Sequence, residues 1–469
     1  MSSWGNTLDA GSQTGQFAPP MVRGASAAPV AAAFDLQRYL LLVGLHVLLG
    51  LMCKQSSAIS TIYAWGTLLV GVNWARTQRQ PEKIAAFAAY IMGAEVLWRM
   101  TKAFAFWEFG KYAVVLILLL GCQRWRPVRP TLVSTWYFLL LLPSCIFTWT
   151  ASDFTFARKQ TSFNLSGPLS LAVCAAFCSR LRLDAAALHR IARAAILPIF
   201  SVSTVVVFGI ATAKELTFGT ESNPLMAGGF GANQVTAVFS VGIILTALTA
   251  LLLSDARNHL QRTFWLVAAV LFSAQSALTF SRSGLYMSGL SVLAAVISTA
   301  KSARLRNAYV LTGIVLYVVG TFVVFPLLNS FTGGALEARF SDTNVTGRDM
   351  LMKSDLDVFQ RHPFLGVGPG MAIANRGITF QAIAAHSEIT RTLAEHGILG
   401  LGALIILCTG IWRRIASMRD VKMRGLFIAT ASFGLLCMLS NAMRIVAPAF
   451  MIGLIFAAER PVERTAHRR

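Results

Sequence analysis

Charged residues are scarce in this chain of 469 residues, at only 13%. A soluble globular protein carries roughly 25%. So few charges cannot cover the surface of a water-soluble body of this size, and the 55% of hydrophobic residues agrees. The composition therefore excludes a soluble globular protein and predicts a polytopic membrane protein.

Acidic residues are fewer than basic residues, with 20 Asp and Glu against 41 Lys and Arg, so the formal net charge is +21. Such an excess can indicate binding to nucleic acid. The basic residues here stand instead in short runs between apolar segments, without interleaved aromatic residues, which is how membrane topology uses them. We therefore expect no nucleic-acid partner.

Cysteines and targeting signals are also sparse. The seven cysteines lie in or beside apolar segments and none has a metal-binding spacing such as CxxC. Cys174 and Cys178 share one helix face, as small thiols packed in a bundle would. Residues 1 to about 33 lack the apolar core of a signal peptide and are predicted to be a disordered cytoplasmic tail. We expect no disulfide framework, metal site or cofactor.

Long apolar runs fill the rest of the chain. A spanning helix needs about 20 apolar residues, and a helix satisfies the backbone of such a segment in lipid. The predicted fold class is an all-α polytopic membrane protein, a bundle of about 12–14 transmembrane helices. Candidate spans cover residues 39–53, 56–75, 84–101, 104–122, 131–150, 166–179, 191–213, 233–254, 263–280, 284–300, 307–328, 397–412, 425–440 and 443–458.

Loop charge orients these spans. With both termini in the cytoplasm, every short basic loop falls on the inner side, as the positive-inside rule requires. Three longer segments then lie outside, over about 151–165, 214–232 and 329–396. The predicted organisation lists a tail (1–33), a transmembrane bundle of about 11 helices (34–328), a long periplasmic loop (329–396), C-terminal transmembrane helices (397–458) and a basic cytoplasmic tail (459–469).

The long outer loop concentrates polar motifs, and long loops on rigid scaffolds often carry function. A helix is predicted from Thr346 to the residues before Pro363. The GVGPG segment (366–370) lies outside any βαβ unit, so it predicts either a tight turn or amides beside a phosphate. His386 then begins a helix at the outer membrane surface, where it is either structural or a general base.

Two further sets of charges stand at the outer ends of predicted helices. Arg282 interrupts two apolar spans with almost no loop, so it is either a functional group at membrane depth or a snorkelling side chain. Glu95, Arg99 and Lys102 share a helix face, and Glu108 and Lys111 follow on the next helix. These five predict either a buried ion network or the wall of a substrate cavity.

Several of these segments resemble one known family. They are GFGANQ (229–234), SRSG (281–284), TGR (346–348), HPFLGVGPG (362–370) and HSEITRTLAEHGILG (386–400). In order and sidedness they resemble the O-antigen ligase and O-antigen polymerase superfamily of bacterial inner-membrane glycan transferases. The resemblance covers residues 229–400; the N-terminal half is similar only in its hydrophobic pattern.

The resemblance implies a GT-C-like enzyme that transfers glycans without a metal ion, by inversion, at the periplasmic face of the inner membrane. Its donor would be an undecaprenyl-pyrophosphate-linked oligosaccharide, and its acceptor another glycan or the lipid A core. By position, His386 would be the general base, and Arg282 and Arg348 would bind the pyrophosphate. Further candidates for substrate contact are Lys214, Arg158, Lys159, Arg391, Glu95, Arg99, Lys102 and Lys111.

Several functional alternatives remain open at this stage. We favour a polymerase of O-antigen or exopolysaccharide, with membrane lipid around it and a chain-length regulator as a candidate partner. A ligase that joins O-antigen to lipid A core is the alternative within the family. A polysaccharide transporter or flippase would show internal repeats and polar sites near the midplane, and the sequence has no visible repeat. A scaffold for an export complex would not need the outer arginines and histidine.

Overall fold

The computed structural model describes residues 35–216, 218, 221–253, 258–300, 303–342, 347–377 and 385–460. The described residues form part of one compact unit, Leu36–Arg469. The predicted N-terminal tail (1–33) lies outside the described residues, as does the predicted C-terminal tail beyond residue 460.

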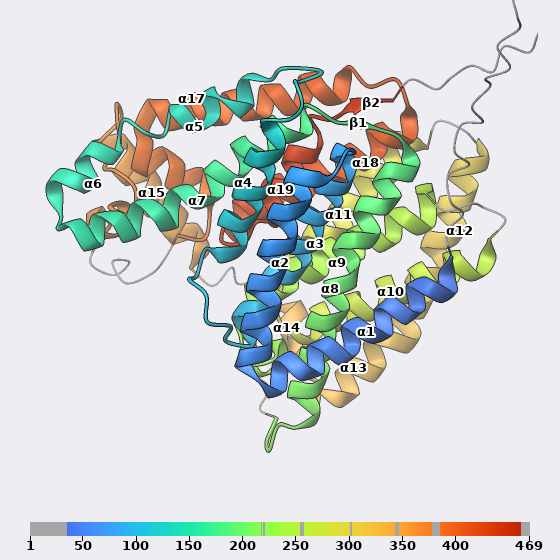
Figure 1. Cartoon of the computed structure of the whole chain (residues 1–469). Coiled ribbons are helices and arrows are strands. Elements are labelled where there is room, and N and C mark those ends of the chain that lie inside the picture. Colours follow the sequence, from blue (N-terminus) through green and yellow to red (C-terminus); the bar gives the residue numbers. More distant parts are fainter. Residues whose placement is uncertain are drawn as a thin grey trace, which may run out of the picture. The chain divides into compact units, whose positions relative to one another are not determined.

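Helices make up almost all of the described chain (Figure 1). In chain order they are α1 (Leu36–Gln55), α2 (Ser57–Thr77), α3 (Pro81–Met100), α4 (Phe109–Cys122), η1 (Leu132–Ser134), α5 (Trp136–Leu139), α6 (Cys145–Ala151), α7 (Phe154–Cys178), α8 (Ala185–Ala211), η2 (Leu225–Ala227), α9 (Ala232–Leu248), η3 (Thr249–Leu253), α10 (His259–Leu278), α11 (Arg282–Thr299), α12 (Ala303–Val319), η4 (Gly320–Val324), α13 (Phe325–Phe331), α14 (Ala335–Ser341), α15 (Arg348–Arg361), α16 (Ala372–Asn375), α17 (Glu388–Ala416), α18 (Val421–Ser440) and α19 (Ala447–Leu454). Two short strands, β1 (Arg182–Leu183) and β2 (Ala458–Glu459), pair in parallel.

Seven helical segments of the described residues are long and apolar enough to cross a membrane. They are α1, α7, α8, α9 with η3, the run Tyr309–Phe331, α17 and α18. The predicted class of all-α polytopic membrane protein is therefore confirmed. The total of about 12–14 spans stays a prediction, since it also counts shorter and less apolar helices.

The predicted span over 131–150 is wrong as a continuous helix. The structure divides it into η1, α5 and α6, because Pro143 has no N–H to donate and its ring clashes with the preceding turn. Helices α4 and α7 run in the same direction, since Lys111 lies beside Ser166 and Gly121 beside Phe177. The broken segment, which joins the end of α4 to the start of α7, must therefore run back along the length of the bundle. Backbone of this kind is tolerated at membrane depth where protein covers it.

The predicted outer loop over 151–165 is also wrong for most of its length. Asp153 caps α7 by accepting hydrogen bonds from the amides of Thr155 and Phe156, so the helix begins at Phe154. An N-cap carboxylate of this kind satisfies amides that otherwise lack a partner at the helix start. Arg158 and Lys159 therefore lie on α7.

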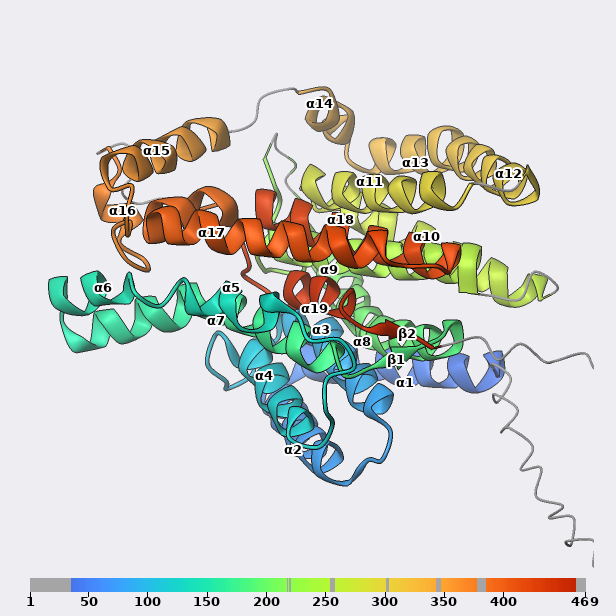
Figure 2. The same cartoon turned by 90° about the horizontal axis from the view of Figure 1, so that it is seen from above.

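Helix packing sets the frame of the site. α8 packs against α1, α3 and α9, while α9 in turn contacts α10 and α11. α18 lies against α11 and α19, and α19 also packs on α7. Figure 2 shows α14, α15 and α16 along one edge of this bundle, with α15 beside α17. The residues just before α17 thus lie next to the segment that follows α18, where the Ala442 amide donates to the His386 carbonyl.

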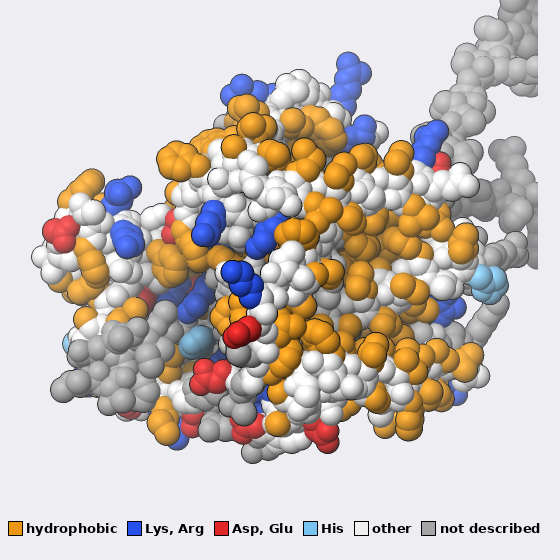
Figure 3. Space-filling view, turned by 90° about the horizontal axis from the view of Figure 1, so that it is seen from below, with side chains coloured by type: hydrophobic (Ala, Val, Ile, Leu, Met, Phe, Trp, Pro, Cys, Tyr) orange, Lys and Arg blue, Asp and Glu red, His pale blue; other side chains and the backbone are white. Residues whose placement is uncertain are grey.

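The surface of the protein is divided into an apolar part and a charged part. In Figure 3 hydrophobic side chains cover a broad part of the face, whereas most charged side chains gather on the remainder. Helix α1 exposes Leu41, Leu45 and Leu48, and the run Tyr309–Phe331 has none of its hydrophobic window buried. Exposed apolar helices of this length are expected to face lipid.

Helix α17 bends where the glycine-rich loop meets it. Gly397 adopts φ 60° and ψ −141° inside the helix, and the amide of Ile398 donates to the Pro363 carbonyl at 2.7 Å. In the loop, the amides of Val367 and Gly368 donate to carbonyls of α17. The tight-turn interpretation of GVGPG is confirmed, and these amides are occupied by protein. Helix α17 begins at Glu388, where Ser387 caps it, and the non-helical backbone of Gly397 interrupts it, so the predicted span from 397 begins at this bend.

We expect Gly397→Ala to lower the free energy of unfolding by about 1–3 kcal/mol or more, since a side chain at this positive φ is strained. An added Cβ would also lie 2.6 Å from the carbonyl carbon of Phe364. Thermal unfolding in detergent measures the change. Gly402→Ala on the same helix is the matched control, because its Cβ would meet only Leu140 at 3.6 Å. Equal stability of the two variants would contradict a constrained bend.

Candidate functional site

Three arginines from different elements line one cavity of about 540 Å³. Arg282 is the first residue of α11, Arg339 belongs to α14 and Arg348 is the first residue of α15. The same cavity has an apolar side that includes Leu290 and Leu439. The structure therefore brings two predicted site residues, Arg282 and Arg348, to one space with a cationic side and an apolar side.

The three guanidinium groups differ in their partners. Arg282 Nη1 donates to the Asp342 carbonyl and reaches the Arg339 carbonyl at 3.5 Å. Arg339 pairs with the Asp342 carboxylate at 3.6 Å and donates to the Phe280 carbonyl at 3.2 Å. Arg348 has no hydrogen bond or ion pair to any residue that the structure describes. Burial and the neighbouring Arg339 and Arg282 lower its pKa. The cavity thus holds a partly buried cation whose donors are available to an anion.

His386 lies next to this cavity, just before α17. Its carbonyl accepts a hydrogen bond from the Ala442 amide at 2.9 Å, which ties it to the segment after α18. Burial, together with the charges of Arg348, Arg444 and Arg376, lowers the pKa of His386 to about 4. The imidazole is therefore neutral at physiological pH and able to accept a proton. Its electrostatic coupling to Arg348 links it to the arginine cavity.

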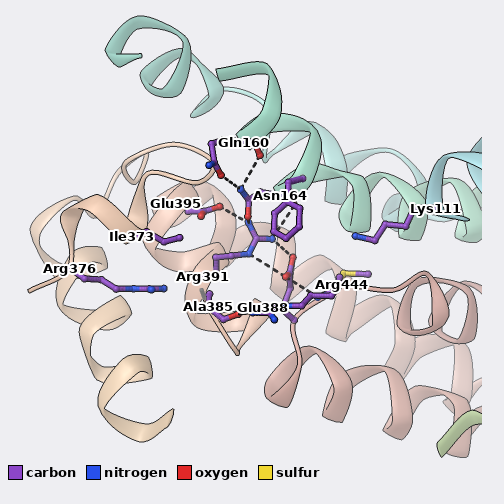
Figure 4. A pocket seen from close by; sticks show the side chains of 13 residues that line it. Lys111, Gln160, Asn164, Ile373, Arg376, Ala385, Glu388, Arg391, Glu395 and Arg444 are labelled. Carbon is purple, nitrogen blue, oxygen red and sulfur yellow. Dashed lines mark hydrogen bonds and ion pairs between the residues drawn. The ribbon is translucent and has the colours of Figure 1, made fainter. Parts of the chain in front are cut away.

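A second, smaller cavity of about 50 Å³ is lined by Ala385 and by residues 442–444 of the segment after α18 (Figure 4). Its lining includes Arg376, Arg444 and Lys111 together with the acids of α17. Arg444 donates to the Ala385 carbonyl at 2.9 Å, directly before His386. Arg376 is buried and paired with Asp355 at 2.6 Å. Arg444 thus links this second cavity to the residue before His386, while His386 itself lines neither cavity.

Arg391 occupies the centre of Figure 4. It pairs with Glu388 and, at 2.5 Å, with Glu395, and it donates to the side chain and carbonyl of Asn164 on α7 at 3.1 Å each. A buried arginine with this many partners holds its neighbours in place, and removing one partner would leave a charge uncompensated. Glu388 also accepts from the Met443 amide at 3.2 Å, so Arg391 joins α7, α17 and the segment after α18.

Comparison with known families gives one match in this part of the chain. Residues 267–405 match the family model described as O-Antigen ligase. The chain carries an O-antigen ligase domain. The superfamily predicted from the motifs is thereby confirmed. The comparison with curated proteins gives no match.

The ligase domain contains most of the groups described above. Its range includes Arg282, Arg339, Arg348 and His386. This match indicates a glycosyl-transfer enzyme whose substrates are a lipid-linked glycan and an acceptor. Arg444 stands outside the matched range but donates to the Ala385 carbonyl within it, so residues beyond this range contribute to the surroundings of His386.

The charges on α3 form a buried network that reaches the segment between α18 and α19. Arg99 pairs with Glu95 at 2.5 Å and donates to Gln234 at 2.7 Å and to the Arg444 carbonyl at 3.0 Å. Glu95 also accepts from the Val446 amide at 2.6 Å. These contacts fix the segment between α18 and α19 from two sides. Of the predicted ion network, the pair Glu95–Arg99 is present, and its contacts hold the backbone around Arg444.

The remaining predicted contacts are dispersed. Lys111 is buried and donates to Ser166 at 3.1 Å. Lys102 is exposed beside a third cavity, of about 140 Å³, that Glu95 and Arg99 also line. Lys214, Arg158 and Lys159 are exposed and do not line either cavity next to His386. Thr346 of the TGR motif lies outside the described residues.

The sequence interpretation missed three basic residues of the ligase site. Arg444 stood in the predicted span 443–458, although a charge between two apolar segments is the same signal that marked Arg282. Arg339 and Arg376 lie in the long loop, where nothing in their local pattern separates them from surface charges. Only the folding of α14 and α16 toward α11 and α17 brings them to the cavities.

Proposed function

We propose that this protein transfers or polymerises undecaprenyl-pyrophosphate-linked saccharides at the periplasmic face of the inner membrane, as a surface-polysaccharide or O-antigen polymerase. One observation carries the proposal: Arg282 and Arg348 line one cavity, and the charge of Arg348 acts on the neighbouring His386. An anion-binding site beside a neutral base suits a reaction in which a hydroxyl displaces a diphosphate.

The donor would lie in the arginine cavity. Its diphosphate sits between Arg282 and Arg348, whose planar guanidinium groups match phosphate oxygens in pairs. Arg348 offers donors that no described residue occupies, while Arg282 also orders the segment around Asp342. The polyprenyl chain follows the apolar side of the cavity past Leu290 and Leu439, both of which are exposed.

The acceptor hydroxyl would approach His386 from beside this cavity. His386 removes the hydroxyl proton while the oxygen attacks the anomeric carbon, and the bond to the diphosphate breaks with inversion. The negative charge that develops on the leaving diphosphate is stabilised by the two arginines. Arg391, Glu95, Arg99 and Lys111 position the surrounding helices, whereas Lys102, Lys214, Arg158 and Lys159 lie at exposed sites and are assigned no step.

Reconstitution tests this function directly. Purified protein in lipid vesicles should convert a lipid-linked repeat unit to longer chains and release undecaprenyl pyrophosphate. Product length is measured by gel electrophoresis of the labelled glycan. Vesicles in which the wild-type chain binds the donor but releases no diphosphate would contradict a transferase.

The description of the matching family favours a second candidate, a ligase that joins O-antigen to lipid A core. The two candidates differ in the acceptor and therefore in the effect of gene deletion. Loss of a polymerase leaves single repeat units on the surface lipid or abolishes exopolysaccharide. Loss of a ligase leaves long chains on the carrier lipid. A chain-length regulator as a partner would be expected only for the polymerase.

The pH dependence of transfer should differ between kcat/KM and kcat. In the free protein the pKa of His386 is about 4, so kcat/KM should not fall until the pH approaches that value, where the base becomes protonated. A bound diphosphate brings negative charge close to His386, which raises the pKa by about one to three units. The acid limb of kcat should therefore lie at higher pH. Coincident acid limbs would contradict a diphosphate next to His386.

A further inference from the structure

A separate crevice lies at the opposite end of α17 from His386. It has a volume of about 430 Å³, between η1, the last turns of α17 and Phe456. Helix α17 runs from Glu388, just after His386, through the bend at Gly397 to Arg413 at the crevice. The crevice therefore lies far along this helix from the ligase site.

The crevice has a basic rim and an apolar wall. Arg129, Arg413 and Arg414 form the rim, and Leu132, Ile405 and Phe456 belong to the wall. Arg414 is buried, and its guanidinium is occupied by the Ala457 carbonyl and by Ser417. It fixes the shape of the crevice.

The other two arginines keep donors available. Arg129 donates to Ser417 at 3.4 Å, and it has no acidic partner among the residues that the structure describes. The Arg413 side chain is exposed and makes no hydrogen bond or ion pair to the residues that the structure describes. Glu459, the acid near this end, accepts from the amides of Arg419 and Asp420. The rim therefore carries uncompensated positive charge directly above an apolar wall.

We propose that this crevice binds an anionic phospholipid, with the headgroup phosphate between Arg129 and Arg413 and an acyl chain along Leu132 and Ile405. Basic pockets between transmembrane helices are a known means of binding anionic headgroups. Trp412 is 69% exposed beside Arg413, as an aromatic side chain at the membrane interface would be. A free phosphate would satisfy the rim but leave the apolar wall uncovered, so the lipid is the better fit.

The bound lipid would add a link between two elements that already contact each other. Arg129 precedes the broken segment η1–α5–α6, and Arg413 lies on α17, which carries His386 at its other end. A phosphate between them holds the broken segment against α17 and raises the stability of the folded state by an amount that grows with the concentration of free lipid. This inference does not depend on the reaction that the ligase site performs.

Native mass spectrometry of the detergent-purified chain tests the proposal. Phosphatidylglycerol and phosphatidylcholine with identical acyl chains are titrated separately, and inorganic phosphate is added in a third arm. We expect phosphatidylglycerol to bind at least about five-fold more tightly than phosphatidylcholine, and each arginine removed to weaken it about five-fold. Phosphatidylglycerol should also raise the melting temperature of the wild-type protein.

Matched variants distinguish the crevice from general surface charge. Arg129→Ala with Arg413→Ala should lose the preference for phosphatidylglycerol, while Arg126→Ala, an exposed arginine outside the crevice, should keep it. Arg413→Ala alone serves if the double variant is unstable, since the Arg413 side chain has no hydrogen bond to lose within the described residues. Equal binding of the two lipids, equal loss in Arg126→Ala, or displacement of lipid by millimolar phosphate would overturn the proposal.

Discussion

His386→Ala should reduce glycan transfer by about 10²–10⁴-fold, the usual contribution of a general base. The loss should appear in kcat, because the donor contacts of Arg282 and Arg348 remain in place. Binding of the lipid-linked donor should change little. The substitution should change the free energy of unfolding little, since the His386 side chain makes no hydrogen bond to the described residues. Transfer is measured as diphosphate release from reconstituted protein.

His362→Ala is the control for this prediction. His362 is an exposed histidine at the end of α15, in the same ligase domain, and it lines neither cavity. It should retain wild-type transfer. If His386→Ala turned over at the wild-type rate, the base would have to be another group, and the proposed chemistry would be wrong. If both variants lost transfer equally, the effect would come from the fold.

Arg348→Ala should lower kcat/KM by about 10²–10³-fold, as removal of a donor aimed at developing negative charge does. Donor affinity should fall as well, since Arg348 is the arginine of the cavity whose donors no described residue occupies. Unlike Arg282, it holds no backbone carbonyl, so its loss should leave the melting temperature nearly unchanged. Lipid-donor binding and diphosphate release, measured on the same preparation, separate the two effects.

Two further variants define the role of Arg348. Arg348→Lys keeps the charge but not the planar pair of donors, so it should recover only part of the loss. Lys353→Ala removes an exposed cation from the same helix, away from the cavity, and should transfer normally. Full activity in Arg348→Ala would mean that the diphosphate binds elsewhere. A loss in Lys353→Ala of similar size would indicate general electrostatic attraction of the substrate.

Much of the fold could be predicted because hydrophobic length and loop charge are properties of the sequence itself. The helices around α8, α9 and α18 follow from apolar runs. The predicted span 131–150 was wrong because one proline, Pro143, outweighs an apolar pattern that otherwise fits a helix. Helix α7 starts at Phe154 because a local cap at Asp153 extends it into residues that look polar enough for a loop.

The site could be predicted only in part. Arg282 and His386 stand out because a charge at the end of an apolar span is costly and the sequence motif is specific. Arg444 and Arg376 became visible only in three dimensions, where the segment after α18 and the loop after α16 approach His386. The role of Arg391 was also hidden, since its partner Asn164 is far away in the chain and no periodicity relates the two.

A structure determined by electron microscopy with a polyprenyl diphosphate in lipid nanodiscs tests the central claim most directly. The diphosphate should lie between Arg282 and Arg348, beside His386, with the prenyl chain leaving past Leu290 and Leu439. A diphosphate bound at the far end of α17, or at the ligase end but out of contact with Arg348, would contradict the account.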